Sequence, residues 1–81
     1  MIHHLKISDK FADAVLNGDK TFEVRYNDRG YNKGDVIVFT VVDSSFTVTH
    51  PLTDKMFEIT YVLSGWGIKE DYVVFGMKII E

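Results

Sequence analysis

The spacing of hydrophobic residues changes along this chain from the period of a helix to that of a β-strand. Phe11, Ala14 and Val15 stand three and four positions apart, which places them on one side of a helix. This pattern predicts a helix over residues 8–18. Gly18 ends it, because glycine readily takes the left-handed backbone conformation that closes many helices.

From residue 21 onward, hydrophobic and polar residues alternate, which predicts a strand with two unlike faces. The apolar face consists of Phe22, Val24 and Tyr26. The polar face consists of Thr21, Glu23 and Arg25. We expect the apolar face to pack on the core and the polar face to point to solvent or into a cleft.

Hydrophobic segments elsewhere in the chain predict five more strands, bounded by turn-forming residues. These segments are residues 3–7, 35–43, 45–50, 56–64 and 72–80. Gly76, inside the last of them, indicates a bulge or the close approach of a neighbouring strand. One helix cannot supply the crossovers of a parallel sheet, so we expect the strands to pair antiparallel.

The predicted fold class is therefore α+β: a small antiparallel β-barrel of five to six strands with one main helix near the N-terminus. Residues 1–81 form a single domain, because no stretch is long enough to link two. Hydrophobic residues make up 46% of the chain, which is typical of a globular protein.

Composition narrows the classes of function. No apolar run approaches the roughly 20 residues that a membrane-spanning helix needs, and the first residues lack the pattern of a secretion signal. Cysteine is absent, which excludes disulfides and zinc bound by thiolates. The three histidines have no partner at a ligand spacing, so we expect no metal and no cofactor. These features favour a cytoplasmic protein that does not bind membranes.

Charge is unevenly distributed. The net charge is −3, which argues against a protein that coats nucleic acid through many phosphate contacts. Residues 20–33 nevertheless contain four cationic and two anionic side chains. A locally basic segment on an acidic protein suits one specific anionic ligand.

The charged residues of this segment have two interpretations. An antiparallel strand with one solvated face carries polar residues at alternate positions, and the charges would then have no further role. Alternatively, Glu23 orients the guanidinium group of Arg25, with Lys20 at the helix–strand junction and Arg29 on the next turn. Such a group of charges fits a site for phosphate or for the edge of a base, both of which arginine binds through two hydrogen bonds.

The segment "NGDKTFEVR" resembles the G-x-K-x-x-E-x-R signature of the ASCH domain, a member of the PUA-like superfamily. The signature matches here as Gly18, Lys20, Glu23 and Arg25. The segments "NDRGYNKGDVIVF" and "GWGIKEDYVVFGMKI" resemble a group of small bacterial and phage proteins within that superfamily, whose function is largely unassigned. The resemblance covers most of the chain and is weakest over residues 44–55.

The resemblance implies a PUA-like β-barrel whose signature lines a cleft beside the helix and binds RNA or a nucleotide-like ligand. Lys20 and Arg25 would contact phosphate or base edges, and Glu23 would orient Arg25 or accept a hydrogen bond from an exocyclic amine. The full candidate ligand-binding set is Lys20, Glu23, Arg25, Asn27, Asp28, Arg29, Lys33 and Trp66.

Two alternatives remain open. Some small ASCH-like proteins are amidohydrolases that deacylate modified cytidine, with a lysine, a threonine three positions later and a distant glutamate as catalytic groups. Here Lys20 is present but Glu23 replaces the threonine, so the catalytic candidates are Lys20 and Glu23, aided by Glu58 or Glu70. The other alternative is a protein-interaction domain without a small-ligand site. An oligomer is compatible with each of these functions.

Aromatic residues add candidate stacking positions. Trp66, between two glycines, either covers the mouth of the barrel or stacks on a base, and we expect the covering role. Tyr31 lies in the basic loop, where its ring is also free to stack.

Overall fold

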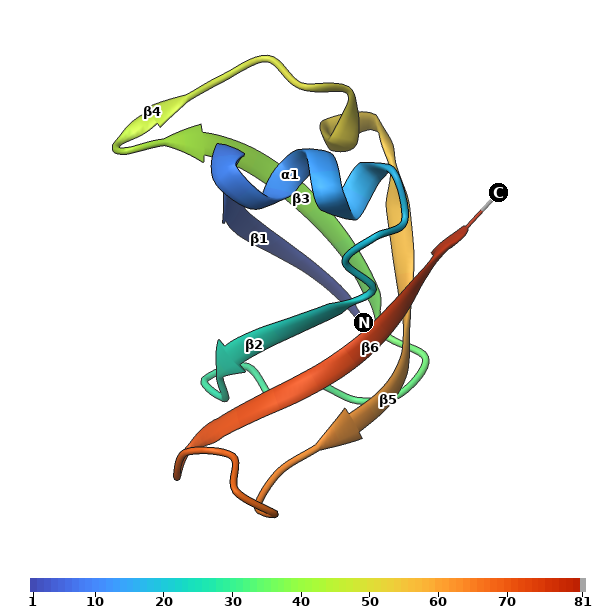
Figure 1. The fold of residues 1–81 in the computed structure, drawn as a ribbon. Coiled ribbons are helices and arrows are strands. Elements are labelled where there is room, and N and C mark those ends of the chain that lie inside the picture. Colours follow the sequence, from blue (N-terminus) through green and yellow to red (C-terminus); the bar gives the residue numbers. More distant parts are fainter. Residues whose placement is uncertain (81) are drawn as a thin grey trace.

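The computed structural model describes residues 1–80 and contains a single curled β-sheet with one α-helix (Figure 1). The elements in chain order are β1 (Ile2–Ser8), α1 (Asp9–Leu16), β2 (Phe22–Tyr26), β3 (Val36–Asp43), β4 (Phe46–Thr47), the short 3₁₀ helix η1 (Pro51–Asp54), β5 (Met56–Leu63) and β6 (Tyr72–Ile80). Most predicted elements are confirmed. The exception is the strand expected over residues 45–50, of which only two residues pair.

Strand order in the sheet is β1-β3-β5-β6-β2, with β4 paired to β3. The expectation of purely antiparallel pairing is wrong, because β1 and β3 are parallel. Parallel neighbours need a crossover of a dozen or more residues, and residues 9–35 provide it with α1 and β2 together. The remaining neighbours are antiparallel.

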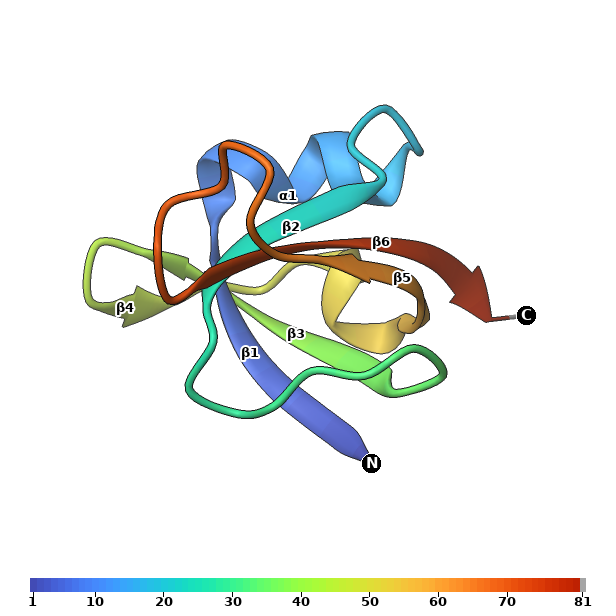
Figure 2. The same ribbon diagram turned by 90° about the horizontal axis from the view of Figure 1, so that it is seen from below.

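The sheet bends around its core, so that β1 and β3 lie on one side and β2 and β6 on the other (Figures 1 and 2). This curl makes a half-barrel, and its two edge strands are β1 and β2. Helix α1 lies across one end of the core. The seam between the two edges is therefore the part of the barrel that strand pairing leaves open.

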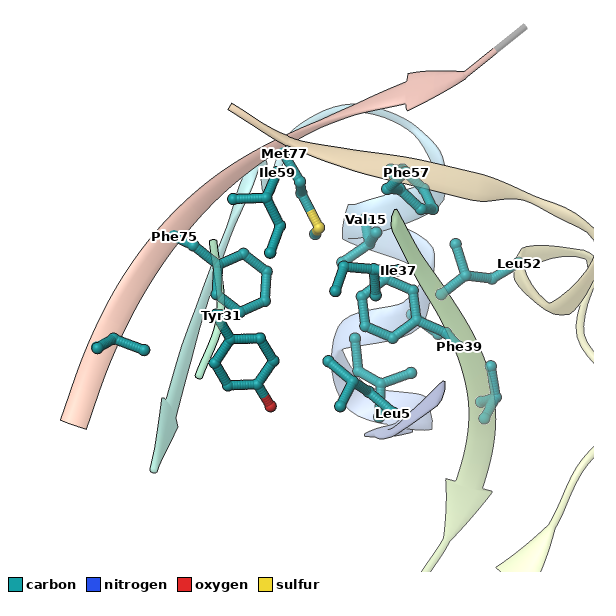
Figure 3. Packing of buried hydrophobic residues seen from close by; sticks show 14 residues of the cluster. Leu5, Val15, Tyr31, Ile37, Phe39, Leu52, Phe57, Ile59, Phe75 and Met77 are labelled. Carbon is teal, nitrogen blue, oxygen red and sulfur yellow. The ribbon is translucent and has the colours of Figure 1, made fainter. Parts of the chain in front are cut away.

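Alternate residues of the strands form the hydrophobic core (Figure 3). The largest fully buried members are Phe39, Phe75, Ile37, Leu52, Ile59 and Val41. Tyr31 belongs to this core, with its ring centroid 5.0 Å from that of Phe75 and 4.8 Å from that of His3. Burial raises the pKa of the Tyr31 hydroxyl above its usual range. The prediction that Tyr31 is free to stack on a ligand is thus wrong.

Helix α1 begins and ends as predicted. The Ser8 hydroxyl accepts a hydrogen bond from the Lys10 amide, and Gly18 has a φ of +87°. The buried side of the helix differs from the expected one, because it consists of Ala12 and Val15. Phe11 is half exposed. The helical period is correct, but the buried face is rotated by about one residue relative to the expected stripe.

A β-bulge interrupts the pairing of β5 with β6. The register shifts between Ile59 and Tyr61, opposite Gly76. A β-carbon on Gly76 would lie 2.8 Å from the Thr60 hydroxyl oxygen, closer than ordinary van der Waals contact. The close approach predicted at Gly76 is confirmed.

We predict that Gly76→Ala lowers the free energy of unfolding by about 1–3 kcal/mol, the usual cost of an overpacked site. Urea denaturation measures the loss. Because the clash is with the Thr60 hydroxyl, the double variant Gly76→Ala/Thr60→Ala should recover much of it, with Thr60→Ala alone as the control. Equal losses in the single and double variants would contradict this origin.

Asp35 ties the start of β1 to the turn before β3. Its carboxylate lies 2.8 Å from the His3 ring nitrogen Nε2 and accepts a hydrogen bond from the Asn32 amide at 3.1 Å. The hydrogen bond with His3, assisted by the one from Asn32, holds the pKa of Asp35 below its usual range.

We predict that this carboxylate makes stability depend on pH in the acid range. The pKa is about 3.9 in an unfolded chain and lower in the fold, so the stabilisation is present above pH ~4 and is lost as the pH falls through the folded-state pKa. Asp35→Asn should flatten the dependence of the free energy of unfolding on pH below ~4. Asp19→Asn, at an exposed position, should leave the slope unchanged.

Candidate functional site

A groove of about 440 Å³ lies along the seam between β1 and β2 and is bounded at one side by α1. Its charged lining consists of Lys6, Lys20, Arg25 and Glu23. Its aromatic lining consists of Phe11, Tyr26 and Tyr72. Three cationic residues and one carboxylate thus line the groove, which gives it the opposite net charge to that of the whole chain.

Strand β2 presents its faces in the reverse of the predicted orientation. Glu23 is only 4% exposed, whereas Phe22, Val24 and Tyr26 are each about half exposed. The expectation that the apolar face packs on the core is therefore wrong. Alternation fixes the period but not which face is inward, and the polar face turns inward here because its charged groups satisfy one another.

Glu23 lies at the centre of a hydrogen-bonded ion network. The Lys20 ammonium donates to Glu23 Oε1 and, at 2.8 Å, to the carbonyl oxygen of Phe22. Arg25 Nε donates to Glu23 Oε2 at 2.9 Å, and Arg25 Nη2 donates to the Lys6 carbonyl oxygen of β1 at 2.7 Å. Both carboxylate oxygens are occupied, and Arg25 joins the two sheet edges.

The two cations keep part of their hydrogen-bonding capacity for a ligand. The side chains of Lys20 and Arg25 are 19% and 23% exposed and line the groove. Within residues 1–80, one N–H of the Lys20 ammonium and both N–H groups of Arg25 Nη1 make no hydrogen bond. Glu23 thus restrains both side chains, and these remaining N–H groups stay available to a ligand.

Aromatic rings flank these donors. The Lys20 ammonium lies 5.5 Å from the ring centroid of Phe11 and 5.1 Å from that of Phe22. At the other end of the groove the rings of Tyr26 and Tyr72 meet edge to face, with centroids 5.6 Å apart. The groove thus combines a cationic centre with apolar rings at both ends.

The other predicted ligand-binding residues do not line the groove. They are Asn27, Asp28, Arg29, Lys33 and Trp66. Arg29 lies 3.9 Å from its exposed neighbour Asp28, and Lys33 borders a separate hollow. Trp66 is 92% exposed, so the expected role as a cover over the barrel is wrong. The cluster predicted from residues 20–33 divides into an inner part at Lys20, Glu23 and Arg25 and a solvated remainder.

The two additional catalytic candidates also lie away from the groove. Glu58 pairs with Lys78 across β5 and β6 at 3.6 Å, and Glu70 is exposed in the loop before β6. Four of the charged and aromatic groove residues were not among the predicted ligand-binding residues: Lys6, Phe11, Tyr26 and Tyr72. Tyr72 reaches the groove as the β6 partner of Tyr26, whereas Lys6 and Phe11 are brought to β2 only by the tertiary fold, which no local pattern indicates.

Over residues 1–80, no group of three histidine, cysteine, aspartate or glutamate side chains is arranged to hold a metal ion. Over the same residues, the longest helix falls far short of what crossing a membrane requires.

Residues 2–77 match a protein family described as a domain of unknown function (DUF3850). The chain belongs to this family. An uncharacterized 12.9 kDa protein encoded in the GpA 3′ region of Escherichia phage P2 is 33% identical over 73 residues, or 90% of this chain. The chain spans 64% of that protein's length. Every charged and aromatic residue of the groove lies inside the DUF3850 match.

We predict that loss of the Glu23 carboxylate destabilises this DUF3850 domain. Glu23→Gln keeps the shape of the side chain but leaves two neighbouring cations without a carboxylate, so it should lower the free energy of unfolding by about 1–3 kcal/mol. Urea denaturation measures this.

The matched control is Glu58→Gln, which removes a carboxylate from an exposed pair. Exposed ion pairs contribute little, so this change should stay within about 0.5 kcal/mol of the wild type. Equal effects of the two substitutions would show that Glu23 is no more than a surface charge.

Proposed function

We propose that this DUF3850 domain binds RNA or a nucleotide-like ligand in the groove between β1 and β2. The observation that carries the proposal is the pair of cations, Lys20 and Arg25, fixed side by side by a buried carboxylate while some of their N–H groups remain unpaired. Such donors suit the oxygens of a phosphate group.

Preorganisation supports this proposal. Long cationic side chains normally lose rotamer freedom when they bind a ligand. In this groove Glu23 and the carbonyl groups of Phe22 and Lys6 already restrain Lys20 and Arg25. Lys6 adds a third positive charge from the opposite edge of the sheet. A phosphate would therefore meet three cations, two of them held in place before binding.

The aromatic lining supports a nucleotide rather than a simple anion. Phe11 and Tyr26 are half exposed beside the cationic centre, which leaves ring surface available to a base. Stacking of a base on an aromatic side chain contributes about 1–3 kcal/mol and depends little on the base. A volume of about 440 Å³ falls in the range of small-ligand sites.

We further propose that the curled half-barrel is of the PUA-like type and that the matched signature is that of an ASCH domain. Support comes from the position of Lys20, Glu23 and Arg25, which line one groove beside α1 as the resemblance implies. With its lack of cysteine, the chain fits a cytoplasmic RNA- or nucleotide-binding protein.

Hydrolysis of a modified nucleoside ranks second. The related amidohydrolases have a threonine where this chain has Glu23, and both catalytic candidates are engaged in one ion network, with the Lys20 ammonium as a donor to Glu23. The solvated-face interpretation, which underlies the protein-interaction alternative, also loses support because Glu23 is buried.

We predict that Lys6→Ala weakens the binding of a labelled single-stranded RNA and reduces its salt dependence. Each phosphate contact contributes about 0.7 to the slope of log K against log salt for single strands. Lys6 is the preferred position because its side chain, unlike those of Lys20 and Arg25, takes no part in the Glu23 network. Fluorescence anisotropy at several salt concentrations gives both quantities.

Lys78→Ala is the matched control, because it makes the same change of net charge outside the groove. It should leave the affinity and the slope close to those of the wild type. Equal effects of Lys6→Ala and Lys78→Ala would contradict binding of the RNA in the groove. Turnover of an acylated cytidine, abolished by Lys20→Ala, would instead favour the hydrolase.

A further inference from the structure

The loop between β5 and β6, residues 64–71, presents the chain's single tryptophan to solvent. Trp66 is 92% exposed. Tryptophan is among the largest apolar side chains and is highly buried on average in folded proteins. An exposed Trp66 therefore contributes little to the packing of this fold.

The backbone of this loop also favours a residue other than tryptophan. Gly65, Trp66 and Gly67 have positive φ values of 70°, 53° and 89°. The Ile68 amide donates to the Gly65 carbonyl oxygen at 2.9 Å, so Trp66 occupies the first central position of a tight turn. Asparagine and glycine are the residues preferred there, and a bulky side chain at positive φ is uncommon. Neither packing nor turn formation accounts for the ring.

The C-terminal end of this loop lies next to the groove. Tyr72 follows the loop directly, lines the groove and packs edge to face on Tyr26. The Lys69 ammonium lies 5.3 Å from the ring centroid of Tyr72. The Asn27 amide donates to the Asp71 carbonyl oxygen at 2.8 Å, which fixes the end of the loop to the end of β2.

The charge of the loop differs from that of the groove. Lys69 is followed by Glu70 and Asp71, so the loop does not attract phosphate. A base is neutral and stacks on an aromatic ring without a cation. The groove and the loop thus suit different parts of a nucleic acid: the phosphate at the groove and a base at Trp66.

Building on the proposed function, we infer that the ligand is single-stranded RNA longer than a mononucleotide, and that Trp66 stacks on a base outside the groove. A mononucleotide has one phosphate and one base, and the groove alone accommodates both. Trp66 does not line the groove, so only a strand that extends beyond the groove would reach the exposed indole. A duplex keeps its bases paired and stacked, so it offers no free ring to Trp66.

Because Trp66 is the only tryptophan, fluorescence excited at a wavelength that tyrosine does not absorb reports on the Trp66 indole. We predict that a short single-stranded RNA quenches the emission, whereas a mononucleotide or the corresponding duplex leaves it unchanged. Trp66→Ala should weaken binding of the single strand about 10-fold, consistent with the loss of one stacked base. Trp66→Phe should retain most of the affinity. The affinity for a mononucleotide, followed by NMR, should be the same in all three proteins.

The outcomes separate the two proposals. If mononucleotide and single strand both bind but the emission is unchanged and Trp66→Ala has wild-type affinity, the inference is overturned and the proposed function stands. If neither RNA nor mononucleotide binds the wild type, the proposed function fails and the inference with it. Quenching by the duplex equal to that by the single strand would also overturn the stacking of an unpaired base.

Discussion

The structure depends on one buried carboxylate and the two cations that hold it. Glu23 faces the interior from an edge strand, and desolvation of a lone carboxylate there would be costly. Lys20 and Arg25 each bind one of its oxygens, and Arg25 continues to the Lys6 carbonyl on the opposite edge. This interaction joins β2 to β1, where no strand pairing does so, and it provides the partners that an inward-facing Glu23 needs.

The same network links architecture to chemistry. Because Glu23 lies inward, Lys20 and Arg25 are drawn into the seam and their remaining donors line a groove. Because β2 is reversed, Phe22, Val24 and Tyr26 are exposed, which adds an apolar outer face next to the charged groove. The Glu23 network therefore both links the two edges of the half-barrel and places cationic side chains along the groove between them.

Much of the fold was predictable from local pattern. The β-branched run of β3, the capped helix and the glycine opposite the bulge each depend on near neighbours in sequence, and each was located correctly. The predicted proximity of Lys20, Glu23 and Arg25 also depends on near neighbours in sequence, and the three side chains do line one groove; their binding role stays a prediction. The wrong or missing predictions concern features that depend on the tertiary fold. They are the parallel pairing of β1, the inward face of β2, and the approach of Lys6 and Phe11 to β2.

The seam has a consequence for the behaviour of the protein in a crowded solution. Unpaired strand edges are templates on which another chain can add, and this is a common start of aggregation. Here the two edges face each other across the groove, and the carbonyl groups of Phe22 and Lys6 already accept hydrogen bonds from side chains of the same molecule. By occupying these edge carbonyl groups, Lys20 and Arg25 oppose the addition of a strand from another molecule, whatever ligand the groove holds.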